Sequence, residues 1–208
     1  MIRRVAFASC YVYSPSGNNV VCKRSRLLRS LLKAGDAKFM QRYAVRVRQQ
    51  VEQDSQLSGY FLPQDVLVPV PGSAPRVRGI WVAAELAQAL VQAGLGSKSW
   101  PGLHRISAVR KSATAAQGAR PTVALHYQSF GIEQPLFPAD SFVLIDDVVT
   151  RGRTLLAAAA RVREAFPHAQ IRTFALLRTM GFLTDIAQLL EPCRGEIRWR
   201  AGDARRIP

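Results

Sequence analysis

The chain has 208 residues, of which 48% are hydrophobic and 21% are charged, so it is globular rather than disordered and long enough for one full domain. Its formal net charge of +15 favours a polyanionic or multiply phosphorylated partner. No apolar run approaches the length of a membrane-spanning helix, and the N-terminus does not resemble a signal peptide. We therefore expect a cytoplasmic protein without a membrane span.

The first 60 residues combine strand-like and basic helical patterns. They predict a strand at 2–13, a turn at 14–19, a second strand at 20–22, a helix at 25–33 and a helix that begins at Asp36 as N-cap and ends near Gln53. Residues 23–48 contain nine lysines and arginines and one acid. This basic segment is a candidate surface for single-stranded DNA or an acidic protein, or else a solvated face.

From residue 65 onward, strand and helix patterns alternate. We expect strands at 65–71, 123–130, 142–145 and 170–177, helices at 80–93, 155–165 and 184–190, a basic loop at 106–120, and a basic, partly loose tail from 195 to 208. Such alternation predicts a parallel sheet with right-handed crossovers. The three cysteines, Cys10, Cys22 and Cys193, lack CxxC spacing and indicate neither a zinc site nor a disulfide framework.

Residues 142–154, with the sequence FVLIDDVVTRGRT, are the most informative segment. The apolar residues 142–145 form a strand that ends in Asp146 and Asp147, where ligands bind in open α/β sheets. The loop that follows enters a helix, whose free N–H groups suit a phosphate. Carboxylates that accept from vicinal hydroxyls, next to a phosphate loop, fit a ribose 5-phosphate. A generic phosphate loop or a plain strand–turn–helix is the alternative.

This segment resembles the phosphoribosyl diphosphate (PRPP) motif of type I phosphoribosyltransferases, in which an apolar strand and two acids precede Thr-Gly-x-Thr. Arg151 stands where that family usually has a threonine. The resemblance implies that Asp146, Asp147 and Thr150 are catalytic. It also implies that a loop holds the 5′-phosphate, comprising Val149, Thr150, Arg151, Gly152, Arg153 and Thr154.

A second loop, VPVPGSAPRVRG at 68–79, leaves the strand at 65–71 and ends at a helix start. Together with the LLKAGD sequence at 31–36, it resembles the ComF-like (competence protein F-like) branch of the phosphoribosyltransferases, here without the N-terminal zinc module. In this resemblance Arg76, Arg78 and Gly79 bind pyrophosphate, unless the loop is only a basic turn. Arg110 and Lys111, in the loop that would close over PRPP, do the same.

The family resemblance implies a doubly wound, mainly parallel α/β sheet with a small N-terminal hood. The corresponding domains are a strand and basic-helix hood at 1–60, a phosphoribosyltransferase-like core at 61–190 and a basic tail at 191–208. Mg²⁺ would be the cofactor, held by Asp146 and Asp147 through water. The reaction would transfer 5-phosphoribosyl from PRPP to an unidentified acceptor and release pyrophosphate.

Two alternative functions stay open at the level of sequence. Arg151 favours a PRPP or nucleotide sensor without turnover, and the basic segment 23–48 favours a ComF-like factor associated with single-stranded DNA. His126, on a predicted strand, is interpreted as structural rather than catalytic. A homodimer is left open.

Overall fold

The computed structural model describes residues 2–75, 79–110, 121–181 and 183–208. The strands are β1 (Arg4–Tyr13), β2 (Val66–Pro69), β3 (Lys98–Ser99), β4 (Leu103–Arg105), β5 (Phe130–Ile132), β6 (Ser141–Val149), β7 (Gln170–Thr179), β8 (Leu190–Arg200) and β9 (Asp203–Ile207). The helices are α1 (Val20–Ala34), α2 (Ala37–Gln53), α3 (Val82–Gln92), α4 (Val123–Gln128) and α5 (Arg153–Ala165).

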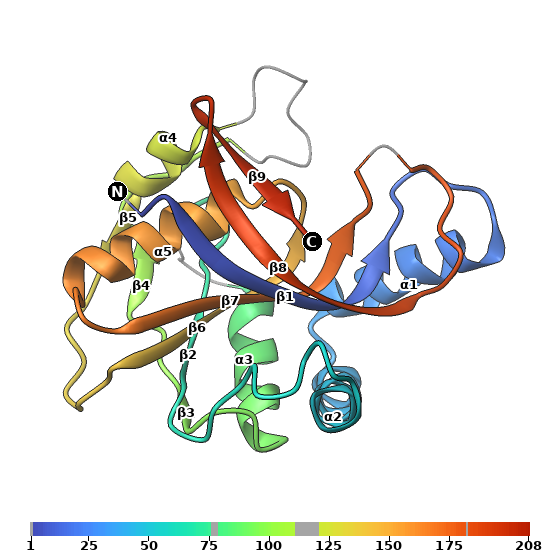
Figure 1. Ribbon diagram of the computed structural model, residues 1–208, viewed down its shortest axis with the longest axis horizontal. Coiled ribbons are helices and arrows are strands. Elements are labelled where there is room, and N and C mark those ends of the chain that lie inside the picture. Colours follow the sequence, from blue (N-terminus) through green and yellow to red (C-terminus); the bar gives the residue numbers. More distant parts are fainter. Residues whose placement is uncertain (1, 76–78, 111–120, 182) are drawn as a thin grey trace.

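Seven strands form one sheet in the order β3-β2-β6-β7-β1-β8-β9, while β4 and β5 pair separately (Figure 1). The strands from β3 to β1 are parallel, and β8 and β9 continue the sheet in antiparallel fashion. The predicted α/β fold with a mainly parallel sheet is therefore confirmed. β1 lies inside this sheet, between β7 and β8, so residues 1–60 contribute a strand to the core as well as α1 and α2.

Helices cover both faces of the parallel strands. The crossover through α3 leads from β2 outward to β3, whereas the crossover through α5 leads from β6 in the other direction to β7. Because right-handed crossovers of opposite direction place their helices on opposite faces, α5 and α4 lie on one side and α3 on the other, together with α2 (Figure 1). Two apolar clusters fill these two layers.

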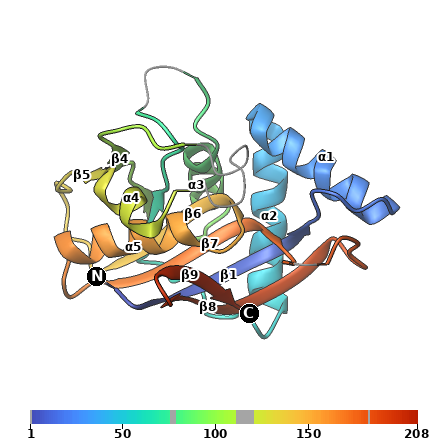
Figure 2. The ribbon, with the colours of Figure 1, turned by 90° about the horizontal axis from the view of Figure 1, so that it is seen from above.

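The strands β8 and β9 replace the loose tail that the sequence predicted. They form a hairpin that curls over the α5 side of the sheet and packs against the start of α5 (Figures 1 and 2). Cys193, Ile197 and Ala204 point from this hairpin into the core and are buried. The alternation of these small and apolar residues with arginines is a strand pattern that the high charge of the segment concealed.

Three further element predictions are wrong. Residues 20–22, predicted as a strand, form the first turn of α1, because Asn19 caps that helix by accepting from the Cys22 N–H at 2.8 Å. Residues 123–130, predicted as a strand, form α4 and the start of β5, because Thr122 caps α4 in the same way. Residues 184–189, predicted as the body of a helix, form bends that lead into β8.

The predicted helix from Asp36 to Gln53 is confirmed as α2. The Asp36 carboxylate accepts from the Phe39 N–H at 2.9 Å, and the apolar face of α2 packs on the sheet. At 17 residues α2 is the longest described helix. None of the helices in the described part of the chain has the length and apolar character needed to cross a membrane.

Candidate functional site

The candidate site lies where the chain direction across the sheet reverses, between β2 and β6. These strands are neighbours and parallel, and the Val70 N–H donates to the Ile145 carbonyl at 2.8 Å just beyond β2. The carboxyl ends of both strands therefore meet at the same edge, which is the usual ligand position in open α/β sheets. This arrangement brings the loop after β2 next to Asp146 and Asp147.

The two aspartates lie in the C-terminal half of β6, three and two residues before its end at Val149. The Asp146 Oδ1 accepts from the Asp147 N–H at 2.8 Å, and the Asp147 Oδ2 lies 2.5 Å from Nζ of Lys33, in the last turn of α1. Burial, and next the neighbouring Asp147 carboxylate, raise the pKa of Asp146 well above its ordinary value. The protein therefore holds one aspartate that resists ionisation beside one that is paired with a lysine.

The loop after β6 is shaped by Gly152. This residue has φ of 87°, in the left-handed region, and a Cβ placed on it would lie 2.7 Å from the Cδ1 of buried Ile197. The glycine thus lets the loop pass directly beneath β8 and turn into α5. Among the described side chains, none caps the N-terminus of α5 by a hydrogen bond. Its first N–H groups and the helix dipole are consequently available to an anion.

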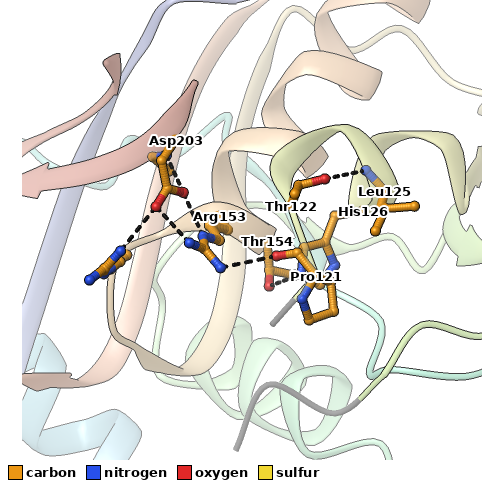
Figure 3. Close-up of polar contacts among 9 residues, drawn as sticks. Pro121, Thr122, Leu125, His126, Arg153, Thr154 and Asp203 are labelled. Atoms are coloured by element: carbon orange, nitrogen blue, oxygen red, sulfur yellow. Dashed lines mark hydrogen bonds and ion pairs between the residues drawn. The ribbon is translucent and has the colours of Figure 1, made fainter. Parts of the chain in front are cut away.

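The two arginines of the loop are engaged by Asp203 at the start of β9. Nε and Nη2 of Arg153 donate to the two Asp203 oxygens at 2.5 and 2.6 Å, and Nη1 of Arg151 donates to Oδ2 at 3.0 Å. Figure 3 shows Arg153 between Asp203 and the Pro121 carbonyl. The hydrogen bond from Arg153 is the main cause that lowers the pKa of Asp203. Here Arg151 and Arg153 therefore fasten the loop to the hairpin.

Arg206 and His126 hold the two ends of the loop, at Thr150 and Thr154 respectively. The His126 Nε2 lies 3.5 Å from the Thr154 hydroxyl (Figure 3), and Nε of Arg206 donates to the Thr150 carbonyl at 3.1 Å. Burial, and then the nearby Arg105 and Arg153, lower the pKa of His126 to about 4. A neutral imidazole that accepts from Arg105 at Nδ1, at 3.0 Å, donates from Nε2 to Thr154. Through these contacts His126, which lies on α4 rather than on the predicted strand, supports the end of the loop.

Arg105 connects three parts of this edge. Its side chain is buried, donates from Nε to the Gly72 carbonyl at 2.8 Å, and lies with Cζ 3.9 Å from the centre of the Phe130 ring. Burial lowers its pKa to about 10, and the field of Asp146 opposes this shift. The Val109 N–H also donates to the Ser73 carbonyl, at 2.7 Å. The loop after β2 and the loop after β4 are thus joined by hydrogen bonds.

The aspartates and the phosphate-loop residues line one cleft of about 470 Å³. The cleft is bordered by Tyr13, Pro15, Arg29, Lys33, residues 146–155 and Thr179. Every residue predicted for the carboxylate pair and the phosphate loop borders it. Arg29 and Lys33 were predicted only as part of a basic surface. Their spacing of four residues on a helix, which places both on one face, is the signal that could have indicated a shared role.

A second, larger cleft of about 930 Å³ adjoins the first and shares Pro15, Thr150, Arg151 and Thr179 with it. Its other walls are the loop after β7, with Met180 among them, and the β8–β9 hairpin. Asp203 contributes to this wall and was not predicted from the sequence. Its position as one of two acids, with Glu196, among the five arginines of residues 194–206 could have indicated it, because buried or clustered cations need a counter-charge.

Of the five residues predicted to bind pyrophosphate, the structure describes only Gly79 and Arg110. Gly79 and Arg110 are exposed and do not border either of these clefts, and Gly79 has φ of 102°. Arg76, Arg78 and Lys111 lie outside the described residues. Within the described ranges, no cluster of three or more histidines, cysteines or acids could form a complete metal site. Two carboxylates at the mouth of a phosphate loop nevertheless fit Mg²⁺, which takes one or two protein oxygens together with substrate phosphates and water.

Comparison with known proteins gives weak likenesses. No protein-family model and no curated protein matches the chain. Among solved structures, a hypoxanthine phosphoribosyltransferase from Staphylococcus aureus is similar over 74% of this chain and 70% of its own, with 12% identity and a TM-score of 0.34. An adenine phosphoribosyltransferase from Leishmania tarentolae is similar over 81% and 83%, with 18% identity and a TM-score of 0.28. The fold class therefore rests on the strand order, and the function on the residues of the cleft.

Proposed function

We propose that the protein is a cytoplasmic, PRPP-dependent phosphoribosyltransferase, which transfers 5-phosphoribosyl to an acceptor and releases pyrophosphate. One observation carries the proposal. Asp146, Asp147 and the uncapped start of α5 border the same cleft of about 470 Å³. A ligand there meets hydrogen-bond acceptors at one end and N–H donors at the other, as a ribose 5-phosphate requires.

In this proposal Asp146 and Asp147 accept from the ribose 2- and 3-hydroxyls, and the N–H groups of residues 151–154 hold the 5′-phosphate. The hydroxyls of Thr150 and Thr154 stand at the two ends of that loop. Arg151 and Arg153 contribute by fixing its shape through Asp203. In the family pattern a threonine stands at the position of Arg151. In this proposal the main-chain N–H groups of the loop make the phosphate contacts in place of that threonine hydroxyl.

The cations over the cleft would stabilise the leaving pyrophosphate. Arg29 and Lys33 border the cleft on the α1 side, and Lys33 already lies against Asp147. Mg²⁺ would be held by Asp146 and Asp147, through water, and would supply charge neutralisation to the pyrophosphate. Because Lys33 and Mg²⁺ compete for the same carboxylate, we propose that Lys33 turns from Asp147 towards the phosphates when PRPP binds.

The acceptor would enter from the adjoining cleft of about 930 Å³, which meets the first at Thr150 and Arg151. Its walls combine apolar side chains such as Met180 and Leu183 with the hydroxyls of Thr179 and Thr184. These walls would accept a flat ring with polar edges, as a nucleobase has.

Isothermal titration with PRPP and Mg²⁺ tests the binding step. Asp147→Asn and Thr150→Val are expected to weaken PRPP at least about tenfold, which corresponds to one lost charge-assisted hydrogen bond. Glu133→Gln removes an exposed carboxylate outside the cleft and should bind PRPP like the unaltered protein. Equal affinity in all four proteins would contradict the proposed site.

The role of Lys33 is tested separately by Lys33→Met. We expect weaker PRPP binding and a higher apparent affinity for Mg²⁺ alone, because the substitution frees Asp147. Lys38→Met removes an exposed lysine from α2 and is the matched control. If Lys33→Met changes neither affinity, Lys33 has no part in the site.

A second candidate function is a PRPP or nucleotide sensor without turnover. The pairing of Arg151 with Asp203 favours it, because the loop then lacks the threonine of the family pattern and has gained a fixed structural contact. Pyrophosphate release, measured with PRPP, Mg²⁺ and a range of purines and pyrimidines, separates the two. Release with any acceptor supports the transferase, and PRPP binding without release throughout supports the sensor.

A further inference from the structure

The strand register aligns three arginines across the open end of the sheet. Arg4 of β1 is paired with Arg198 of β8, and Arg198 is paired with Arg205 of β9. Residues paired across a sheet point to the same face, so the three side chains form one arginine row. All three residues are exposed. The row would span about 10 Å, at the usual strand spacing of about 4.8 Å.

Like charges directly opposite one another on a sheet disfavour folding unless a counter-ion lies between them. A single ion pair is described within the row, from Nε of Arg198 to Oε2 of Glu196 at 2.6 Å. Arg194, also exposed, lies further along the same face of β8. The row therefore retains excess positive charge, in a protein whose net charge is already +15.

No described helix covers this part of the sheet. The buried residues Val5, Ile197 and Ala204 point the other way, into the layer of α5. The α2 layer instead includes Ala8 and Cys10, from farther along β1. The arginine row therefore lies on the side facing away from α5. The strands β8 and β9 that carry two of its arginines form the margin of the sheet (Figure 2).

The neighbours of the row limit what can bind it. Two positions along these strands from the arginines lie Ala6, Glu196, Arg200, Asp203 and Ile207, none of them aromatic. The acid among them at the hairpin turn, Asp203, is paired with Arg151 and Arg153. Protein interfaces have an apolar, often aromatic centre with few charges, which this face lacks. Binders of single-stranded nucleic acid stack unpaired bases on exposed aromatic rings, whereas the ring beside Arg194, that of Tyr60, is fully buried. Binding to the phosphates of a duplex, by contrast, requires only positively charged side chains, without an apolar or aromatic surface.

We propose that the arginine row binds the sugar–phosphate backbone of duplex nucleic acid, independently of base sequence and of the phosphoribosyltransferase site. A duplex strand presents one phosphate about every 3.4 Å along its axis, so a row of about 10 Å can contact two or three phosphates. The bound phosphates would also relieve the repulsion among Arg4, Arg198 and Arg205. This surface differs from the basic segment 23–48 that the sequence indicated.

Fluorescence anisotropy with a labelled duplex of about 20 base pairs, at about 50 mM salt and upward, tests the proposal. The triple variant Arg4→Gln/Arg198→Gln/Arg205→Gln should bind at least about tenfold more weakly at low salt. The slope of log affinity against log salt should become shallower by about 2 to 3, because each phosphate contact contributes about 0.9. Its thermal unfolding midpoint should not fall, which excludes misfolding as the cause.

The matched control, Lys23→Gln/Arg24→Gln/Lys38→Gln, removes the same charge from exposed positions of α1 and α2. It should change the affinity and the slope by less than half as much as the row variant. Equal losses in both variants would show that binding follows net charge and would overturn the assignment to the row. The absence of duplex binding at low salt would overturn it as well.

Two further probes decide the kind of partner. A labelled single strand of the same length should bind more weakly than the duplex, and a polyglutamate peptide of matched charge should not displace the duplex. Tighter binding of the single strand, or displacement by the peptide, would overturn the proposal in favour of a single-stranded or an acidic protein partner.

Discussion

Residues 146–154 carry charged side chains at both ends, and the two ends differ in the partners that these charges have. The β6 end carries Asp146 and Asp147, and the α5 end carries Arg151 and Arg153. At the β6 end, two carboxylates lie side by side, and burial and mutual repulsion raise the pKa of Asp146. At the α5 end, both arginines share one carboxylate, Asp203, whose pKa is lowered by the hydrogen bond from Arg153. The charges at the β6 end therefore destabilise the folded state, whereas the ion pairs at the α5 end stabilise it.

This difference distinguishes residues suited to binding a ligand from residues that hold the loop in place. Charges that destabilise the folded state persist where a ligand or metal compensates them, and mutually paired charges hold a backbone in place. In the proposed function the aspartates therefore contact the ligand, whereas Arg151 and Arg153 fix the shape of the loop through Asp203. Substitutions at the two ends should consequently change stability in opposite directions.

The largest effect is expected from Gly152→Ala. A methyl group there meets Ile197 at 2.7 Å in a backbone conformation that L-residues rarely adopt, so the free energy of unfolding should fall by about 4 kcal/mol. Gly59→Ala, at φ of 66° with open space around the Cβ, should cost only about 1 kcal/mol. Chemical denaturation measures both. Equal costs would show that Ile197 yields and that the loop is not held by β8.

The next effect concerns His126 and pH. Its folded pKa of about 4 lies below its ordinary 6.5, so the unfolded chain takes up the proton first. Stability is fully present above pH 6.5 and should fall as pH drops towards 4, by up to about 3 kcal/mol. Denaturation across this range should show a flatter profile for His126→Gln and an unaltered one for the exposed His168→Gln. Parallel profiles for all three proteins would contradict a buried neutral His126.

A smaller loss is expected for Asp203→Asn, which leaves Arg151 and Arg153 without their shared carboxylate. We expect the free energy of unfolding to fall by about 2 kcal/mol at neutral pH, since charge-assisted hydrogen bonds are removed. The loss should be complete above pH 3.8 and should shrink as pH falls from 3.8 through the lowered folded pKa of Asp203, because below that pKa the carboxyl is protonated in both states. Glu52→Gln, in the exposed pair with Arg48, should cost less than about 1 kcal/mol.

The smallest effect has the opposite sign. Asp146→Asn should raise the free energy of unfolding by about 1 kcal/mol at neutral pH while it weakens PRPP binding. The raised pKa means that the folded state loses stability as pH rises from 3.8 through the folded value, and an amide avoids that loss. Asp140→Asn, at an exposed carboxylate, should change neither quantity. A destabilised Asp146→Asn protein would show that this end is not strained.

The sequence predicted the strand–loop–helix unit at 142–165 because each part has a strong local signal. A run of apolar residues indicates a buried strand, a glycine permits a left-handed turn, and an alanine-rich run favours a helix. α2 was predicted for a similar reason, the cap at Asp36. Local signals failed at 123–130 and in the tail. At 123–130 a cap at Thr122 outweighs the alternation, and in the tail the arginines concealed the apolar positions.

By itself, then, the sequence determined the α/β class, the position of the aspartate pair and the loop at the start of α5. Only the tertiary structure decided which charges meet. Lys33 reaches Asp147 across 114 positions of sequence, Asp203 reaches back to Arg153 across 50, and Arg4 lies beside Arg198 through strand register. Periodicity and capping act over a few residues, whereas charge pairing depends on how distant strands and helices pack, and neither composition nor spacing encodes that packing.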